Sequence, residues 1–203
     1  MGCCSSCWEK EDGPSEKELE MKAKKLSISR NMTSPHVEIG GKGEISGEGL
    51  ALAGVQIEQD AAYWECHITL PSKTHCDTIM FGVTSKKNRG FYEELEDKIL
   101  GEEGVSSQHT GTNWMRKVEV ENGDVVGVAV QQSDLPMIQF YLNGEPLHDR
   151  AVNRFRGTVY PAACLPKSVS GKLKVHLVLE ERCFKQRSPG DRFGPVIVAR
   201  SIV

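Results

Sequence analysis

The stretch of sequence from residue 122 to residue 165 decides the fold. It begins Asn122-Gly-Asp-Val-Val-Gly-Val-Ala-Val130 and continues after a polar break as Met137-Ile-Gln-Phe-Tyr-Leu-Asn-Gly144. It ends Gly157-Thr-Val-Tyr-Pro-Ala-Ala-Cys-Leu165. In its first two segments apolar residues occupy every second position, which is typical of a strand with one buried face. Asn143-Gly144 accepts the positive φ angles of a tight hairpin turn, so the chain is predicted to reverse there, and the stretch as a whole predicts an antiparallel sheet.

The same alternation occurs on both sides of this stretch. In residues 63–70, Trp64, Cys66, Ile68 and Leu70 share one face, and Tyr63, Glu65, His67 and Thr69 share the other. Residues 79–83 and 172–179 repeat the pattern. Many short strands at close, turn-marked spacing indicate an all-β sandwich rather than an α/β fold. The predicted core residues are Trp64, Phe81, Val128, Phe140 and Leu177.

Little helix is expected. A Ser15-led capping box favours a short helix over residues 15–26. Phe91, Leu95 and Ile99 lie four apart, which suits one or two helical turns within residues 90–100. Residues 193–203 are apolar enough to return to the body as a closing strand or a packed tail.

Five segments in order resemble the SPRY family. They are Tyr63-Trp-Glu-Cys-His-Ile68, Met80-Phe-Gly-Val-Thr84, Gly123-Asp-Val-Val-Gly127, the hairpin Ile138-Gln-Phe-Tyr-Leu-Asn-Gly144, and Tyr160-Pro-Ala-Ala-Cys-Leu165. The resemblance covers roughly residues 35–188. It implies a bent antiparallel β-sandwich of the concanavalin-like type, used as a protein-binding module with no catalytic activity.

In that family the loops around a shallow groove contact the partner. The corresponding loops here are residues 86–92, 108–116, 131–136 and 148–156. The partner-binding residues predicted within them are Asn113, Trp114, Arg116, Gln132 and Asp134. A tryptophan with an arginine nearby is typical of an interface hot spot, and removing such a contact residue should weaken binding with little loss of stability. The alternative is that Trp114 starts a strand and fills the core.

Length and charge limit the other possibilities. The 203 residues suit a tail and charged linker over residues 1–30 and one domain over residues 31–203. The formal net charge is −3 and no basic block occurs, so nucleic acid is not an expected partner. No apolar run is long enough to span a bilayer. The chain is expected to be a monomer.

The first residues, Met1-Gly-Cys-Cys-Ser-Ser6, match an N-myristoylation signal at Gly2. One myristoyl chain binds membranes only weakly, and the acidic and basic residues between positions 8 and 30 balance each other. Cys3 and Cys4 are therefore the predicted second anchor, through S-palmitoylation. The resulting prediction is a flexible, doubly acylated tail that holds the domain on the cytosolic face of a membrane.

Two other interpretations of this tail remain open. It could be an unmodified disordered segment, or Cys4 and Cys7 could share a metal ion, although no second ligand pair lies nearby. Three of the seven cysteines lie in this tail, and no secretory signal is evident, so a disulfide framework is not expected.

No catalytic signature stands out. Cys76 with His67, His75, His109 or His148 could form a nucleophile pair, but no local motif brings a base and an oxyanion hole together. Cys66 and Cys164 fall in predicted strands and are expected to be inert core residues. The prediction is a protein that is not an enzyme and has no cofactor, no metal site and no catalytic residue. The rival interpretations are a lectin-like or small-ligand-binding sandwich and a cysteine-dependent hydrolase.

Overall fold

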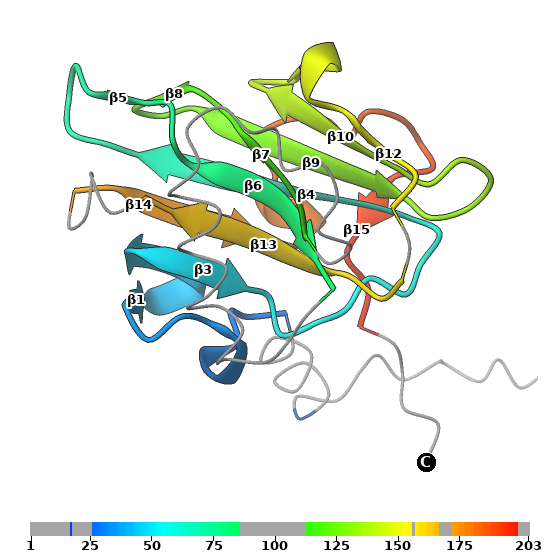
Figure 1. Ribbon diagram of the computed structural model, residues 1–203, viewed down its shortest axis with the longest axis horizontal. Helices are drawn as coiled ribbons and strands as arrows, with labels where there is room; N and C mark the ends of the chain where they lie inside the picture. Colours follow the sequence, from blue (N-terminus) through cyan, green and yellow to red (C-terminus); the bar gives the residue numbers. More distant parts are fainter. Residues whose placement is uncertain (1–16, 18–25, 86–112, 156, 167–171, 199–203) are drawn as a thin grey trace, which may run out of the picture.

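The structure of the protein is a computed structural model that describes residues 17, 26–85, 113–155, 157–166 and 172–198 (Figure 1). Within them the chain forms two stacked sheets and a two-stranded ribbon. The larger sheet contains, in order, β1 (Val37–Ile39), β2 (Glu44–Gly47), β14 (Lys174–Val178), β4 (Ala61–Thr69), β9 (Val125–Gln131), β10 (Met137–Leu142) and β11 (Glu145–Pro146), with β12 (Val152–Asn153) beside β10 and β15 (Gly194–Pro195) beside β4. The smaller sheet contains β3 (Gly49–Leu52), β13 (Tyr160–Leu165), β6 (Met80–Thr84) and β7 (Asn113–Lys117). The ribbon pairs β5 (His75–Cys76) with β8 (Val120–Glu121).

Short 3-10 turns complete the described chain. They are η1 (Arg30–Met32), η2 (Gly41–Gly43), η3 (His148–Arg150) and η5 (Glu181–Cys183). The two helices predicted from sequence lie outside the described residues, apart from Lys17, which is helical, and Leu26. The predicted closing strand at the C-terminus is present as β15, which pairs in parallel with β4.

The core lies between the two sheets, where apolar side chains from alternate positions meet. The five predicted core residues, Trp64, Phe81, Val128, Phe140 and Leu177, are all at most 5% exposed. Val128 is opposite Trp64 on one side and opposite Phe140 on the other, so these three side chains lie in one row across the larger sheet. The strand pairing confirms the predicted fold class, a bent antiparallel β-sandwich.

The predicted hairpin turn is also confirmed. Asn143 and Gly144 have φ angles of 52° and 89°, and they join β10 to β11. The Asn143 side chain stabilises the turn because its Oδ1 accepts the Val125 N–H at 2.9 Å and its Nδ2 donates to Asp124 at 2.9 Å. This residue therefore supplies both the backbone conformation and the hydrogen bonds that close the turn.

Both sheets also bury side chains on the face that points away from the core. On the smaller sheet these form an apolar cluster with Met32 packed against it: Leu50, Leu52, Met80, Met115, Tyr160, Ala162 and Cys164. On the larger sheet, Tyr63 and Ala129 are buried together with Phe193 from the C-terminal segment. The alternation in the sequence predicts which residues share these outer faces, but not that the faces are covered.

The packed body begins before residue 31. Ile28 forms a bridge with Ala53 and is 6% exposed, and the Ser27 carbonyl accepts the Gly54 N–H at 2.8 Å. A few residues of the segment predicted as linker are therefore part of the sandwich.

Candidate interaction surface

Trp114 and Asn113, two of the predicted partner-binding residues, open strand β7 and are buried. Their exposed fractions are 5% and 3%. The Trp114 ring packs edge-on against Phe155, with 5.7 Å between the ring centroids. The structure thus places Trp114 where the alternative interpretation put it, in the core. A binding role for either residue stays a prediction. Because both side chains are buried, such a role would be indirect, through the position of strand β7.

Arg116 lies two positions further along β7 and is only partly buried. Its Nη1 donates to the Met115 carbonyl at 2.9 Å. Burial lowers the pKa of Arg116, and the nearby positive charge of Arg150 lowers it further. The Arg150 side chain in turn contacts Asp149 at 3.1 Å. Arg116 is therefore the partly exposed member of the three predicted residues on β7, and it lies near a second arginine.

Gln132 and Asp134 belong to the loop between β9 and β10, and they have different roles. Gln132 Nε2 donates to the carbonyls of Ile57 and Gln59, both at 2.9 Å, so its side chain holds the loop against the segment before β4. Asp134 is exposed and has a φ of 55°, a left-handed conformation that turns the chain back toward β10. Of these two predicted residues, Asp134 faces solvent and Gln132 organises the loop.

Gln59 joins this loop to the C-terminal segment. Its Nε2 donates to the Pro195 carbonyl at 2.7 Å, and its Oε1 accepts the Ile197 N–H at 2.7 Å. Ser133 adds a further contact, since its Oγ donates to Asp60 at 2.6 Å. We call this region the loop end: residues 57–60, 131–136, 153–154 and 195–198. Figure 1 shows the β9–β10 loop and the chain after β15 on the same, right-hand side of the sandwich.

The loop end carries two exposed aliphatic side chains. Leu135 is 74% exposed and Ile197 is 55% exposed, and they are the large apolar side chains that are exposed within the described part of the chain. The same segments carry exposed charged residues: Glu58, Asp60, Asp134 and Arg154. Exposed apolar side chains among charged residues, on loops held by hydrogen bonds, are suited to binding another protein.

Neither Leu135 nor Ile197 is among the partner-binding residues predicted from the sequence. The signal for Leu135 was present, because it lies between Asp134 and Pro136 in a predicted loop, where an apolar residue has no strand face to occupy. Ile197 carried no such signal, since it follows Val196 in an apolar segment predicted to pack.

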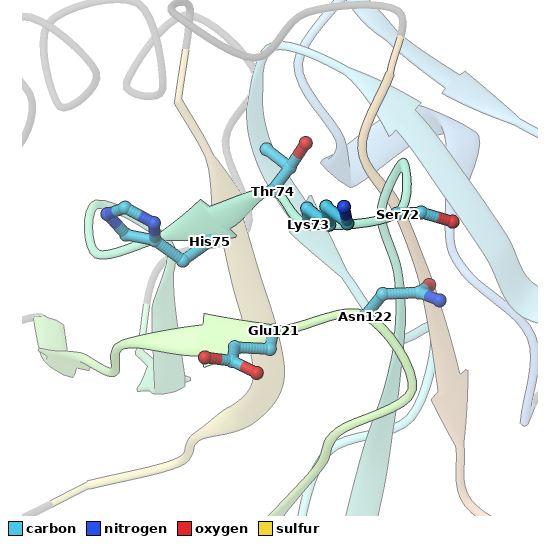
Figure 2. Close-up of a pocket in the computed structure, with 6 residues that line it drawn as sticks. All are labelled: Ser72, Lys73, Thr74, His75, Glu121 and Asn122. Atoms are coloured by element: carbon cyan, nitrogen blue, oxygen red, sulfur yellow. The ribbon is translucent and has the colours of Figure 1, made fainter.

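A hollow lies at the end of the sandwich opposite the loop end, between the turn before β5 and strand β8. It has a volume of about 320 Å³ and is lined by Ser72, Lys73, Thr74, His75, Glu121 and Asn122. Figure 2 shows that these side chains point in different directions and do not converge on one point. The hollow is polar and open to solvent, and because its side chains diverge it does not hold a set of groups arranged for catalysis.

The described cysteines and histidines that were considered for catalysis differ in burial and in their contacts. Cys76 is buried and its Sγ lies 3.4 Å from the Thr78 hydroxyl, whereas His75 is exposed. His67 contacts the Glu65 carboxylate at 2.7 Å. Burial raises the pKa of the Cys66 thiol, which keeps it protonated and unreactive. His148 lies in η3, and His109 lies outside the described residues.

Within the described ranges no group of three metal-ligating side chains comes together. The predicted lipidation residues Gly2, Cys3 and Cys4 lie outside the described residues, as does Cys7. Among the helices that the structure describes, none has the length and apolar character to cross a membrane.

Comparison with known proteins relates the chain to others through its fold. No family model and no curated protein matches the sequence. The NEUZ (NHR) domain of Neuralized from Drosophila melanogaster superimposes with a TM-score of 0.51 at 10% identity, over 75% of this chain and 90% of that one. A crystal structure of the Neuralized NHR1 domain gives 0.49 at 10% identity, over 74% and 96%. The SPRY domain of human HERC1 gives 0.47 at 13% identity, over 74% and 96%. At these identities the likeness concerns the fold alone.

Proposed function

We propose that this chain is a SPRY-like protein-interaction module without catalytic activity, which binds a protein or peptide ligand at its loop end and is tethered to the cytosolic face of a membrane by N-terminal acylation. The observation that carries the proposal is the pair of exposed aliphatic side chains, Leu135 and Ile197, on segments that Gln59 and Gln132 fix in place. The SPRY resemblance of the sequence supports the same function.

Rigidity of the loop end favours binding. An exposed leucine on a flexible loop loses conformational freedom when it binds, which weakens the complex. Here the backbone on both sides of Leu135 is fixed, because Gln132 N donates to the Asp60 carbonyl at 2.7 Å and Arg154 N donates to the Pro136 carbonyl at 2.7 Å. The loop therefore presents Leu135 in a conformation set by its hydrogen bonds.

The binding proposal can be tested by selecting peptides on the immobilised full-length chain from a random phage-displayed library. Leu135→Asp should weaken a selected peptide by more than about 2 kcal/mol, the loss expected for a central contact. The free energy of unfolding of Leu135→Asp should differ from that of the wild type by less than about 0.5 kcal/mol, because the side chain is on the surface. Lys73→Asp, at the opposite end of the sandwich, is the matched control and should bind as the wild type does. Peptides that bind Leu135→Asp and Ile197→Asp as tightly as the wild type would overturn the assignment of the site.

The tether is tested separately by metabolic labelling and fractionation. Gly2→Ala should leave the protein soluble and its cysteines unacylated, because myristoylation brings Cys3 and Cys4 to the membrane where palmitoylation occurs. Cys3→Ser with Cys4→Ser should leave a myristoylated protein that binds membranes loosely. High salt should release little of the intact protein, since the charges of residues 8–30 balance. Membrane association of Gly2→Ala, or release of the wild type by salt alone, would contradict dual acylation.

A further inference from the structure

Glu65 is the one charged side chain that is fully buried within the described part of the chain. It lies on the outer face of β4, in the middle of the larger sheet, with 0% exposure. A buried carboxylate is unfavourable unless its oxygens accept hydrogen bonds. Glu65 accepts four: from the N–H groups of Lys185 at 2.7 Å and Gln186 at 2.8 Å, from His67 Nε2 at 2.7 Å, and from the Tyr63 hydroxyl at 3.3 Å.

The two backbone donors belong to the segment that follows β14, residues 180–198, which we call the C-terminal strap. The strap lies over the outer face of the larger sheet. Phe184 packs edge-on against Tyr63 with 5.2 Å between ring centroids, and Phe193 joins the same buried cluster. The strap then re-enters the sheet as β15, where Gly194 and Pro195 pair with Ala62 and Tyr63 of β4.

Apolar packing alone does not fix the position of such a segment along the sheet. The Phe184 and Phe193 rings bury apolar area, but this attraction has no direction. Two consecutive N–H groups that bind the two oxygens of one fixed carboxylate add contacts that depend on direction as well as distance. Together with the Phe184 ring and the β15 pairing, Glu65 therefore helps to fix the register of the strap on β4.

The register of the strap determines what the loop end exposes. From the residues bound by Glu65 the strap continues to Pro195 and Ile197, which Gln59 holds at 2.7 Å each. Ile197 is thus the exposed end of a segment whose other end is fixed by a buried acid. The other exposed aliphatic residue, Leu135, lies on a loop that Glu65 does not contact.

We infer that Glu65 is a positioning residue for the interaction surface: it locks the C-terminal strap onto the sheet and thereby presents Ile197 to a partner. This inference rests on the proposed function, because it assumes that the loop end binds a ligand. Glu65 itself contacts no partner, and its effect on binding passes through the strap.

The first test follows amide hydrogen exchange by NMR in the full-length chain. In Glu65→Gln, the amides of Lys185, Gln186 and Ile197 should exchange at least about 10-fold faster than in the wild type, while Val128 in the core should keep its protection. Glu44→Gln is the matched control, since Glu44 is an exposed glutamate on strand β2 that pairs with Lys174, and it should leave the strap unchanged. If Ile197 keeps its protection in Glu65→Gln, the inference is wrong.

A measurement on the wild type covers the case in which Glu65→Gln does not fold. Low concentrations of urea reveal which amides become exposed in the same opening event. Lys185, Gln186 and Ile197 should open together, at a lower free energy than Val128. If Ile197 opens without Lys185 and Gln186, the strap is not one unit and the inference fails.

The second test is binding, with a peptide selected on the wild-type chain whose affinity falls in Ile197→Asp. Glu65→Gln should weaken this peptide about 10-fold, and Glu44→Gln should not. Unchanged affinity in Glu65→Gln would overturn the inference. If selection yields no peptide that depends on Leu135 or Ile197, the proposed function fails, and the exchange measurements still decide whether Glu65 locks the strap.

Discussion

The position of Trp114 yields a quantitative prediction about its role. Its side chain is 5% exposed and packs on Phe155, so Trp114→Ala should remove a core contact and leave a cavity. Truncation of a buried tryptophan to alanine costs about 3–5 kcal/mol. Within the described residues β7 is the last strand of the smaller sheet, so its neighbours can partly relax, and we expect a loss near about 3 kcal/mol.

Urea unfolding followed by tryptophan fluorescence measures this loss, because Trp64 remains in the core as a reporter. With a slope of about 2 kcal/mol per molar urea, the midpoint should fall by about 1.5 M. Leu135→Ala is the matched control, since an exposed leucine should change stability by less than about 0.5 kcal/mol. In the peptide assay, Leu135→Ala should lose affinity although it remains stable. Trp114→Ala should lose stability, and its folded fraction should still bind the peptide.

One result would refute this reasoning. If Trp114→Ala unfolds within about 0.5 kcal/mol of the wild type and also loses peptide binding, Trp114 is a surface hot spot, as the sequence first indicated.

Three further changes test the core and the outer face of the larger sheet. Phe140→Ala should lower the free energy of unfolding by about 3–5 kcal/mol, and a loss below about 1 kcal/mol in urea unfolding would show that the wrong face is buried. In Gly127→Ala the new Cβ would lie 2.5 Å from the Tyr63 hydroxyl oxygen, so the free energy of unfolding should fall by about 1–3 kcal/mol. In a Tyr63→Phe background the same substitution should cost less, and equal losses in the two backgrounds would contradict the contact. Burial raises the pKa of Glu65, but hydrogen bonds from His67 and the two strap amides outweigh burial and lower it below its usual value. The stability that Glu65 contributes should therefore be fully present above the ordinary carboxyl pKa of about 4.3, and it should be lost as the pH falls through the lower pKa that Glu65 has in the folded protein. If the stability of the wild type and of Glu65→Gln changes with acid pH in the same way, this prediction is contradicted.

Much of the fold could be predicted because its strands follow a period of two. Alternation in residues 63–70 and 122–142 gives the buried faces of β4, β9 and β10, and Asn143-Gly144 gives the turn. These signals are local, since each depends on neighbours within a few residues.

What could not be predicted depends on contacts between distant segments. The alternation places Tyr63 and Glu65 on the outer face of β4, but nothing near them shows that residues about 120 positions later cover that face. The burial of Trp114 has the same kind of cause: its sequence neighbours are polar, whereas the residue that packs on it is Phe155. The loop end likewise combines four segments that lie far apart in the sequence, and hydrogen bonds such as those of Gln59 and Gln132 join them.

The most direct test of the central claim is an NMR titration of the full-length, isotope-labelled chain with a peptide selected on it. If the loop end is the interaction surface, amide shifts should concentrate at residues 58–60, 132–135 and 196–197. Shifts that cluster at residues 72–75 and 121–122 around the opposite hollow, with the loop end unchanged, would contradict the account.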